Sequence, residues 1–231
     1  MTTQTFPVIG GSRTRLTRLD NCGNIAYGAS AQAVTDGFVS VAITANYDDG
    51  TEISVRNADG RRCVQRDAEP ELVNLSATIT FCKVDPDWYT ALTGFPAEVN
   101  ATGETIGFRV DSSILPNSVR NALEVWADAF DEGCGVDGEV PYAYFLWPNL
   151  GGGRVSDYTL ENNAVTFAIS GMLTKKGSGW GVGPYDVTRD ETDAPDALQS
   201  PVTATQHQVT FYTTVAPPAV TDGLTTLTEP V

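Results

Sequence analysis

The side chains that could act as catalysts or metal ligands are few in this sequence. His207 is its one histidine, so a zinc site with two histidine ligands cannot form. A serine–histidine–acid triad needs only one histidine, but no Gly-x-Ser-x-Gly elbow exists to present the serine. His207 falls in an alternating run, where a surface or packing role is the usual one. We therefore expect no catalytic residue and interpret the protein as one that is not an enzyme.

Two loops contain residue types that bind ions in other proteins. Four alternating glycines are superficially similar to those of a phosphate loop, namely Gly177, Gly179, Gly181 and Gly183. Such a loop needs a helix directly after it, and Pro184-Tyr185-Asp186 predicts none, so a flexible or contact loop is the simpler interpretation. Four acids could bind calcium, namely Asp131, Glu132, Asp137 and Glu139, but the EF-hand spacing is absent. We interpret them as a solvated turn and expect neither a metal nor a cofactor.

Three tryptophans, Trp126, Trp147 and Trp180, could form an aromatic platform for a sugar. Tryptophans near strands belong more often to a core or an interface. A surface carbohydrate-binding β-sandwich module is therefore the alternative function. It would need a signal peptide, and the first residues, MTTQTFPVIGGSRTRL, lack the apolar core of one.

The chain is acidic, with a formal charge of −15 from 29 acidic and 14 basic residues. Such a chain has no general means of gripping phosphates, although it could repel a polyanion. Residues 1–35 are basic and residues 181–231 are acidic, so these ends could attract each other between copies. Two solvated ends are the simpler alternative.

Four cysteines, Cys22, Cys63, Cys82 and Cys134, allow three pairings. Without a signal peptide we expect the protein to mature in a reducing cytoplasm, which favours free thiols. If any pair forms, Cys63 with Cys82 is the one we expect.

The strongest structural pattern runs from residue 72 to residue 94. Nine residues alternate strictly, which predicts a strand with one buried and one wet face. The expected buried face is Val73, Leu75, Ala77, Ile79 and Phe81, and the expected wet face is Asn74, Ser76, Thr78 and Thr80. A short helix follows at about residues 86–93, because Asp85 can cap it, Pro86 suits its first position and Gly94 suits its end.

A second alternating run, residues 38–47, precedes a long polar hairpin. Its apolar face would be Val39, Val41, Ile43, Ala45 and Tyr47. Asp48-Asp49-Gly50 predicts a turn, with Ile53 and Val55 on a returning strand and a further turn at 57–60. Residues 44–66 thus form a long, charged hairpin, and loops of this length usually carry either an interaction or no function.

About nine short strands and one helix predict a mainly β protein, either a β-sandwich or a barrel. Residues 140–150 are apolar on both faces, so this strand should lie between two layers or between subunits. We divide the chain into an irregular N-terminal arm (1–35), a β-domain (36–214) and a C-terminal extension (215–231). Because the ends show no periodicity, we expect neighbouring copies to hold them.

Several blocks of the sequence resemble the major tail (tail tube) proteins of long-tailed actinobacterial phages, the siphophages. The run GFVSVAITANYDDGTEISVRNADGRRC (37–63) leads to LVNLSATITFCKVDPDWYTALTG (72–94), and WGVGPYDV (180–187) and HQVTFYTTVAPP (207–218) follow. The similarity spreads over roughly residues 10–220 as a pattern of blocks.

This resemblance implies a structural virion protein with a tail-tube fold. Six copies would close into a ring, and stacked rings would form a hollow tube that conducts DNA to the host. Each subunit would lend strands to a shared inner barrel, and the long hairpin and chain ends would reach neighbouring rings. A ring of six subunits would carry −90 formally, which would let DNA pass without sticking. The expected partners are further copies, a tape measure protein, tail terminator and distal tail proteins, and passing DNA, with no membrane. The expected place is the virion tail, after assembly in the host cytoplasm.

Two sets of residues would serve this function. The wet face should line the lumen, namely Asn74, Ser76, Thr78 and Thr80. The hairpin should make contacts between rings through Asp48, Asp49, Glu52, Arg56, Arg61, Arg62 and Arg66, with the last three near its base. Asp111 and Glu124 are the acids that we expect to face DNA.

Overall fold

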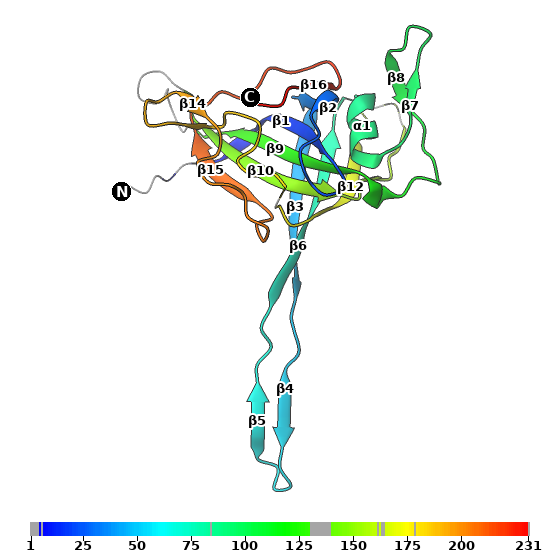
Figure 1. Ribbon diagram of the computed structural model, residues 1–231. Coiled ribbons are helices and arrows are strands. Elements are labelled where there is room, and N and C mark those ends of the chain that lie inside the picture. Colours follow the sequence, from blue (N-terminus) through cyan, green and yellow to red (C-terminus); the bar gives the residue numbers. More distant parts are fainter. Residues whose placement is uncertain are drawn as a thin grey trace.

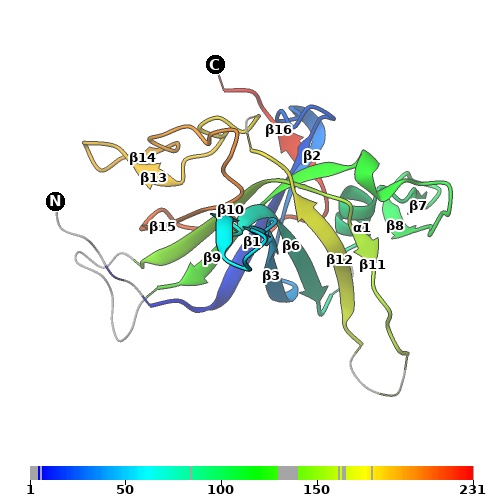
Figure 2. The same cartoon turned by 90° about the horizontal axis from the view of Figure 1, so that it is seen from below.

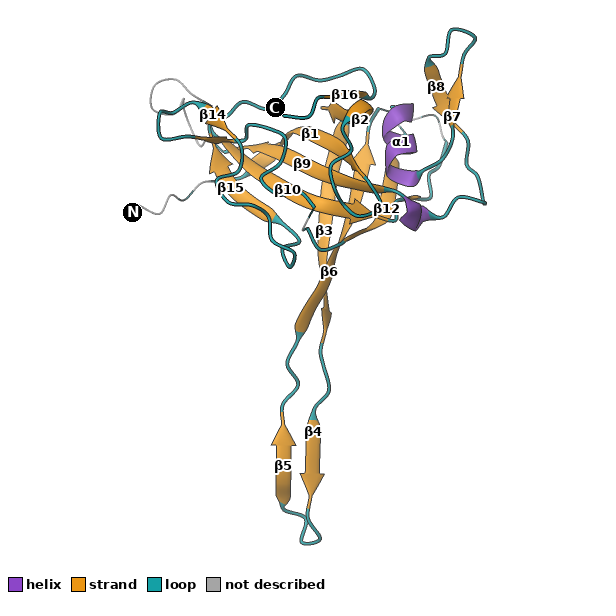
Figure 3. Ribbon diagram, in the orientation of Figure 1, coloured by secondary structure: helices purple, strands orange, loops and turns teal. Residues whose placement is uncertain are grey.

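Antiparallel strands dominate the computed structural model, which describes residues 5, 7–83, 85–129, 140–160, 162, 165–177 and 179–230. Ten strands form one large sheet. Its main path contains β1 (Ile9–Leu19), β2 (Gly28–Thr35), β3 (Phe38–Asp48), β6 (Glu71–Phe81), β9 (Arg120–Asp128), β10 (Tyr142–Gly151), β12 (Phe167–Thr174) and β16 (Thr225–Leu227). Their order is β16-β2-β1-β9-β10-β12-β6-β3, with β11 (Arg154–Val155) on β12 and β15 (Val209–Thr213) on β10. The predicted mainly β class is therefore confirmed (Figure 3).

Smaller elements lie around this sheet. Three two-stranded sheets are formed by β4 (Ile53–Arg56) with β5 (Arg62–Arg66), β7 (Ala97–Val99) with β8 (Thr105–Phe108), and β13 (Thr188–Arg189) with β14 (Pro195–Asp196). Within the described residues, the helices are α1 (Pro86–Thr93) and one 3₁₀ turn, η1 (Pro116–Ser118). In Figure 2, β13 and β14 lie at one end of the sheet, and α1, β7 and β8 lie at the other. No helix in the described part of the chain has the length and apolarity needed to span a membrane.

The sheet folds over itself at the end of β10. Only Leu150 and Gly151 of β10 pair with β12, whereas β10 pairs with β9 along most of its length. The strands β1, β9 and β10 consequently cross β3 and β6 at a steep angle, as Figure 1 shows. The main core fills the space between the two groups and beneath α1. Its fully buried members include Leu16, Ile79, Trp88, Leu123 and Ile169.

A second core lies on the opposite face of β9 and β10. Trp126, Tyr144 and Leu146 pack there against Trp180 and Val187 of the loop that connects β12 to β15. The strand β10 is thus buried on both faces, which confirms the prediction made from its two apolar faces.

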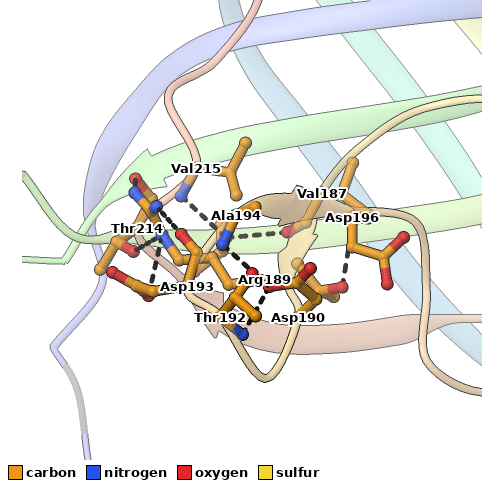
Figure 4. Close-up of polar contacts among 11 residues, drawn as sticks. Val187, Arg189, Asp190, Thr192, Asp193, Ala194, Asp196, Thr214 and Val215 are labelled. Atoms are coloured by element: carbon orange, nitrogen blue, oxygen red, sulfur yellow. Dashed lines mark hydrogen bonds and ion pairs between the residues drawn. The ribbon is translucent and has the colours of Figure 1, made fainter.

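The loop over this second core is fixed by Arg189, as Figure 4 shows. Its guanidinium donates to the Thr214 hydroxyl at 2.7 Å and to the Asp193 carbonyl at 2.6 Å. The carboxylate of Asp190 accepts from the backbone N–H groups of Thr192 and Ala194 at 2.7 and 2.9 Å. A loop without long strands is therefore held in place by side-chain hydrogen bonds.

The helix α1 begins and ends where the sequence predicts. The Asp85 carboxylate accepts from the Asp87 N–H at 2.9 Å, Pro86 occupies the first turn, and Gly94 ends the helix at a φ of 79°. Trp88 is buried and packs edge-on against Phe81 with ring centroids 5.7 Å apart. The helix thereby closes the main core over the end of β6.

The prediction of an irregular N-terminal arm is wrong. Residues 9–19 and 28–35 form β1 and β2, and β1 lies inside the large sheet between β2 and β9. The sequence did not predict β1 because the strand is buried on both faces at residues 14–17, where three of the four residues are polar, namely Thr14, Arg15 and Thr17. The boundary placed at residue 35 therefore does not separate two structural units.

The C-terminal extension is also attached to its own chain. The strand β16 pairs with β2, the Thr221 N–H donates to the Val34 carbonyl at 3.0 Å, and the Leu224 N–H donates to Asp87 at 3.0 Å. Our expectation that neighbouring copies must hold this segment is therefore wrong for residues 215–230. Residues 1–4, 6 and 231 lie outside the described residues.

Candidate functional site

A two-stranded hairpin projects away from the sheet, as Figure 1 shows. Residues 47–73 form this projecting hairpin, and every one of them is exposed. The strands β4 and β5 pair near its end, with Ile53 opposite Arg66 and Arg56 opposite Arg62. At a rise of about 3.3 Å per residue, ten residues in each leg reach roughly 30 Å from the body of the protein. Such a segment buries no surface against the main core and gains no stability from it.

The turn of this hairpin lies at residues 57–60, and the turn predicted at 48–50 is wrong. The strand β3 pairs with β6 as far as Asp48 and Glu71, and β4 then continues outward instead of returning. Gly50, at a φ of 69°, makes a local kink in which a Cβ would lie 2.9 Å from the Glu69 carbonyl oxygen. The residue types Asp-Asp-Gly suit both a local kink and a full reversal of the chain. The sequence alone therefore did not show which of the two forms at residues 48–50.

This change in the turn moves the arginines from the base of the hairpin to its far end. Arg61 and Arg62 adjoin the turn, and Arg66 lies opposite Ile53. Together with Arg56, they make residues 53–66, the hairpin tip, basic, because Asp59 is the one acid there. The adjoining hairpin neck, residues 48–52 and 67–71, has no basic residue and six acids: Asp48, Asp49, Glu52, Asp67, Glu69 and Glu71. Among the described residues no arginine of the tip lies in an ion pair.

Large apolar side chains are also exposed along the hairpin. Ile53, Val55 and Val64 are 45, 48 and 52% exposed, and Tyr47 and Val73 are more than half exposed. We expected Val73 on the buried face of its strand and Tyr47 on the apolar face of the 38–47 run, but both are exposed because the alternation continues beyond the core into the projecting hairpin. Such a row of apolar residues is typical of a contact surface.

The four residues expected to line a lumen share one face of β6. Asn74, Ser76, Thr78 and Thr80 are half-buried, whereas the residues between them are buried. Asn74 accepts from the Asn46 side chain at 2.7 Å. The wet face predicted from the alternation is confirmed as a structural feature, while its role as a lumen wall stays a prediction.

The neighbouring strand extends this polar face. The residues of β3 that pair with those four are Asn46, Thr44, Ala42 and Ser40, and we did not assign them to a site. The alternation from 38 to 47 was the signal that could have identified them. The resulting eight-residue polar face consists of seven polar residues and Ala42, and it contains no charge.

The strand β3 is one edge of the large sheet. Val39 is 57% exposed, and beside it lies an apolar groove of about 480 Å³ lined by Val41, Phe145 and Trp147, among others. An edge strand with apolar neighbours is a template for pairing with another strand.

Glu124 does not face the surface, so the prediction that it faces DNA is wrong. It is fully buried and accepts from Arg15 Nε and Nη2, at 2.5 Å each, and from the Tyr144 hydroxyl at 2.6 Å. Burial alone would lower the pKa of Arg15, but the charge and hydrogen bonds of Glu124, together with Tyr185 and Tyr144, raise it. The guanidinium also lies 3.3 Å from the centre of the Tyr185 ring. A buried acid in a strand covered on both faces needs such partners.

The other acid that we expected to face DNA has a local role. Asp111 accepts from the backbone N–H and the hydroxyl of Ser113 at 2.8 Å each. These bonds lower the pKa of its carboxyl. Whether Asp111 faces DNA stays a prediction.

The three tryptophans do not form an exposed platform. Trp126, Trp147 and Trp180 are at most 4% exposed and belong to the two cores. His207 pairs its Nδ1 with the Thr174 hydroxyl at 2.8 Å. The sugar platform that the alternative function requires is therefore not made by these residues.

The thiols Cys22, Cys63 and Cys82 are free and exposed. Cys63 lies on β5 in the hairpin tip, whereas Cys82 follows the last residue of β6. The whole of β6 separates them, so a disulfide within one chain is not possible. Cys134 lies outside the described residues.

No group of three or more histidine, cysteine, aspartate or glutamate side chains in the described ranges is placed to hold a metal ion. The acids considered for calcium, at 131–139, lie outside those ranges. Comparison with models of protein families and with curated proteins finds no match to this chain.

Proposed function

We propose that this protein is the structural subunit of a phage tail tube, in which rings of six copies stack into a hollow conduit for DNA. The observation that carries the proposal is the projecting hairpin. Residues 47–73 are exposed throughout, carry a row of apolar side chains and reach far beyond their own core. A monomer leaves this surface unused, whereas a neighbouring ring would cover it.

Contacts within a ring would use the edge of the large sheet. The strand β3 ends the sheet beside the apolar groove at Val39. Pairing β3 with a strand of the next copy would remove this edge and cover the groove. Around a closed ring, the same pairing would produce an inner barrel.

The lumen of that barrel would be the eight-residue polar face on β3 and β6. Because this face is uncharged, it offers no cation to a phosphate, and the net charge of −15 on each copy repels the DNA backbone. Asn74, Ser76, Thr78 and Thr80 would keep the wall wet and non-adhesive. DNA would pass as cargo without specific binding.

A tube also needs a defined length and defined ends. The partners that we propose are therefore further copies of this chain, a tape measure protein in the lumen, and the tail terminator and distal tail proteins. The proposed location is the virion tail. The proposed role needs no catalytic residue.

Shortening the hairpin tests this proposal. Replacing residues 52–67 by a tight Asn-Gly turn would leave the core and the β3–β6 pairing intact, so the thermal midpoint should stay unchanged. In sedimentation velocity, the parent protein should form large assemblies and the shortened variant should not. The matched control is Asp59→Ala, which keeps the hairpin length and should assemble. Assemblies of equal size from the shortened variant would contradict the proposal.

A further inference from the structure

A cleft of about 610 Å³ lies at the end of the molecule opposite the hairpin. Four separate segments line it: the β2–β3 turn, the start of α1, the start of β8 and the C-terminal segment at 220–223. Phe81, the last residue of β6, and Trp88 form part of its wall. Because these segments are separated in sequence, the cleft exists only in the folded chain.

The cleft is strongly acidic. It contains one lysine, Lys83, and five carboxylates: Asp36, Asp85, Asp87, Glu104 and Asp222. Asp36 forms ion pairs with Arg13 at 3.7 Å and with Lys83 at 3.9 Å. Burial, together with the charge of Asp87, raises the pKa of Asp85. Asp85 and Asp87 therefore repel each other, and a cationic group from outside would relieve this repulsion.

A donor in the cleft wall is also unsatisfied. The indole N–H of Trp88 is buried and has no hydrogen-bond partner among the described residues. The apolar part of the wall comes from Phe81, Trp88 and Val220. The cleft thus offers a negative rim and an apolar floor.

The hairpin tip has the complementary character. It carries four arginines against one acid, and none of the four is in an ion pair among the described residues. Ile53, Val55 and Val64 are exposed beside them. The hairpin neck, with its six acids, disfavours DNA as the occupant of these arginines, because a phosphate backbone would lie against carboxylates.

The two surfaces face opposite directions along β6. Its antiparallel register with β3 places Asp48 and Glu71 at the hairpin end, and Phe38 and Phe81 at the cleft end. Figure 1 shows the hairpin and α1 pointing away from each other. A head-to-tail contact between surfaces on opposite ends of the molecule repeats along an axis when its rotation does not close a ring.

We propose that the hairpin tip of one copy docks in the acidic cleft of the next copy along the axis, with its arginines against the cleft carboxylates. This inference rests on the proposed function, and it names the surface on the neighbouring copy that receives the hairpin. The order of the contact is head-to-tail, so each copy donates one tip and receives another.

Two native thiols allow a direct test. Cys63 lies in the hairpin tip, and Cys82 follows Phe81 at the cleft; both are exposed. In a Cys134→Ser background, a short bismaleimide should link Cys63 of one copy to Cys82 of the next and yield a ladder of dimers, trimers and longer chains. Cys63→Ser or Cys82→Ser should each abolish the ladder, and the matched control Cys22→Ser should keep it. A mixture of Cys63→Ser and Cys82→Ser protein should give a single heterodimer.

The same variants separate this inference from the proposed function. If electron microscopy shows tubes but the ladder does not depend on both thiols, the inference fails and the proposed function stands. If neither polymers nor linked chains form, both fail. If double-stranded DNA shields Cys63 from modification while self-association does not, the tip binds DNA and the inference is overturned.

Charge reversal provides an independent arm of the test. Arg61→Glu with Arg62→Glu, or Asp36→Lys with Asp222→Lys, should raise the protein concentration needed for assembly at least roughly tenfold, because like charges would meet. An equimolar mixture of the two variants should assemble again. The matched control, Asp186→Lys with Glu191→Lys, reverses exposed acids outside the cleft and should assemble normally. Assembly of either reversed variant alone at the parent concentration would overturn the inference.

Discussion

Arg15 and Glu124 are direct cross-strand partners on β1 and β9, and their side chains form a two-pronged ion pair inside the second core. Both residues are at most 6% exposed. Tyr144 and Tyr185 complete the surroundings of this pair. The pair thus joins the two strands beneath the loop that Arg189 fixes.

Removing one partner of this pair should strongly destabilise the fold. Glu124→Ala leaves a buried guanidinium without its counter-charge, which should reduce the free energy of unfolding by about 3–5 kcal/mol. Urea denaturation measures this change. The matched control is Glu98→Ala, which removes the exposed partner of Arg109 and should have little effect.

Removing both partners distinguishes charge burial from packing. Arg15→Met combined with Glu124→Leu should recover much of the stability that Glu124→Ala loses, because no uncompensated charge stays buried. A double variant as unstable as Glu124→Ala would show that lost packing, and not the charge, causes the effect.

The pH dependence of stability should reveal the cost of burying the ionised carboxylate of Asp85. Burial raises its pKa in the folded state, so its carboxyl contributes most below the unfolded pKa of about 4, and this contribution is lost as pH rises through the folded pKa. As the pH is lowered from 7 to 4, the unfolding free energy of the parent protein should therefore increase relative to that of Asp85→Asn. Asparagine preserves the helix cap.

Asp190 is a control, because its effect on stability should change with pH in the opposite direction. Its hydrogen bonds, led by that of Thr192, lower the pKa of its carboxyl, so its contribution is present above the unfolded pKa and lost on acidification. The parent protein relative to Asp190→Asn should thus lose stability as pH falls. Equal slopes for the two variants would contradict the assignment of Asp85.

The edge strand should be sensitive to charge. Val39→Lys places a cation on the exposed edge beside the apolar groove, which should prevent pairing with another copy while changing the unfolding free energy by less than about 0.5 kcal/mol. Size-exclusion chromatography should then show the monomer. Val110→Lys, at a position that is 72% exposed and outside any strand, should leave assembly unchanged. Rings formed by Val39→Lys protein would refute the role of β3.

The polar face should be shielded inside an assembly. In a variant whose four cysteines are replaced by serine, Thr78→Cys should react quickly with a bulky maleimide in hairpin-shortened protein. In assembled Thr78→Cys protein that keeps the full hairpin, the same thiol should react many times more slowly, as measured by gel shift. Equal rates would place Thr78 on the outside.

Local signals in the sequence predicted β6 and α1 well. The alternation at Leu75 to Phe81 reflects a strand with one dry face, and the cap at Asp85 and the left-handed Gly94 act within a few residues of the helix. Such short-range causes can be recognised without knowing the fold.

Long-range causes could not be recognised in the same way. Arg15 and Glu124 are polar residues at buried positions, and only their pairing across 109 residues explains them. The kink at Gly50 depends on the approach of Glu69 from the returning leg. The acidic cleft collects carboxylates from segments that the sequence keeps apart, so its existence could not be predicted from spacing.

Copies of this chain should stack into a tube that covers the hairpin and the sheet edge of each subunit. Electron microscopy of the purified protein at physiological salt can show this stacking. We expect hollow tubes with six-fold end views, or rings that lengthen with protein concentration. Dispersed single molecules at every concentration, with the projecting hairpin free, would contradict it.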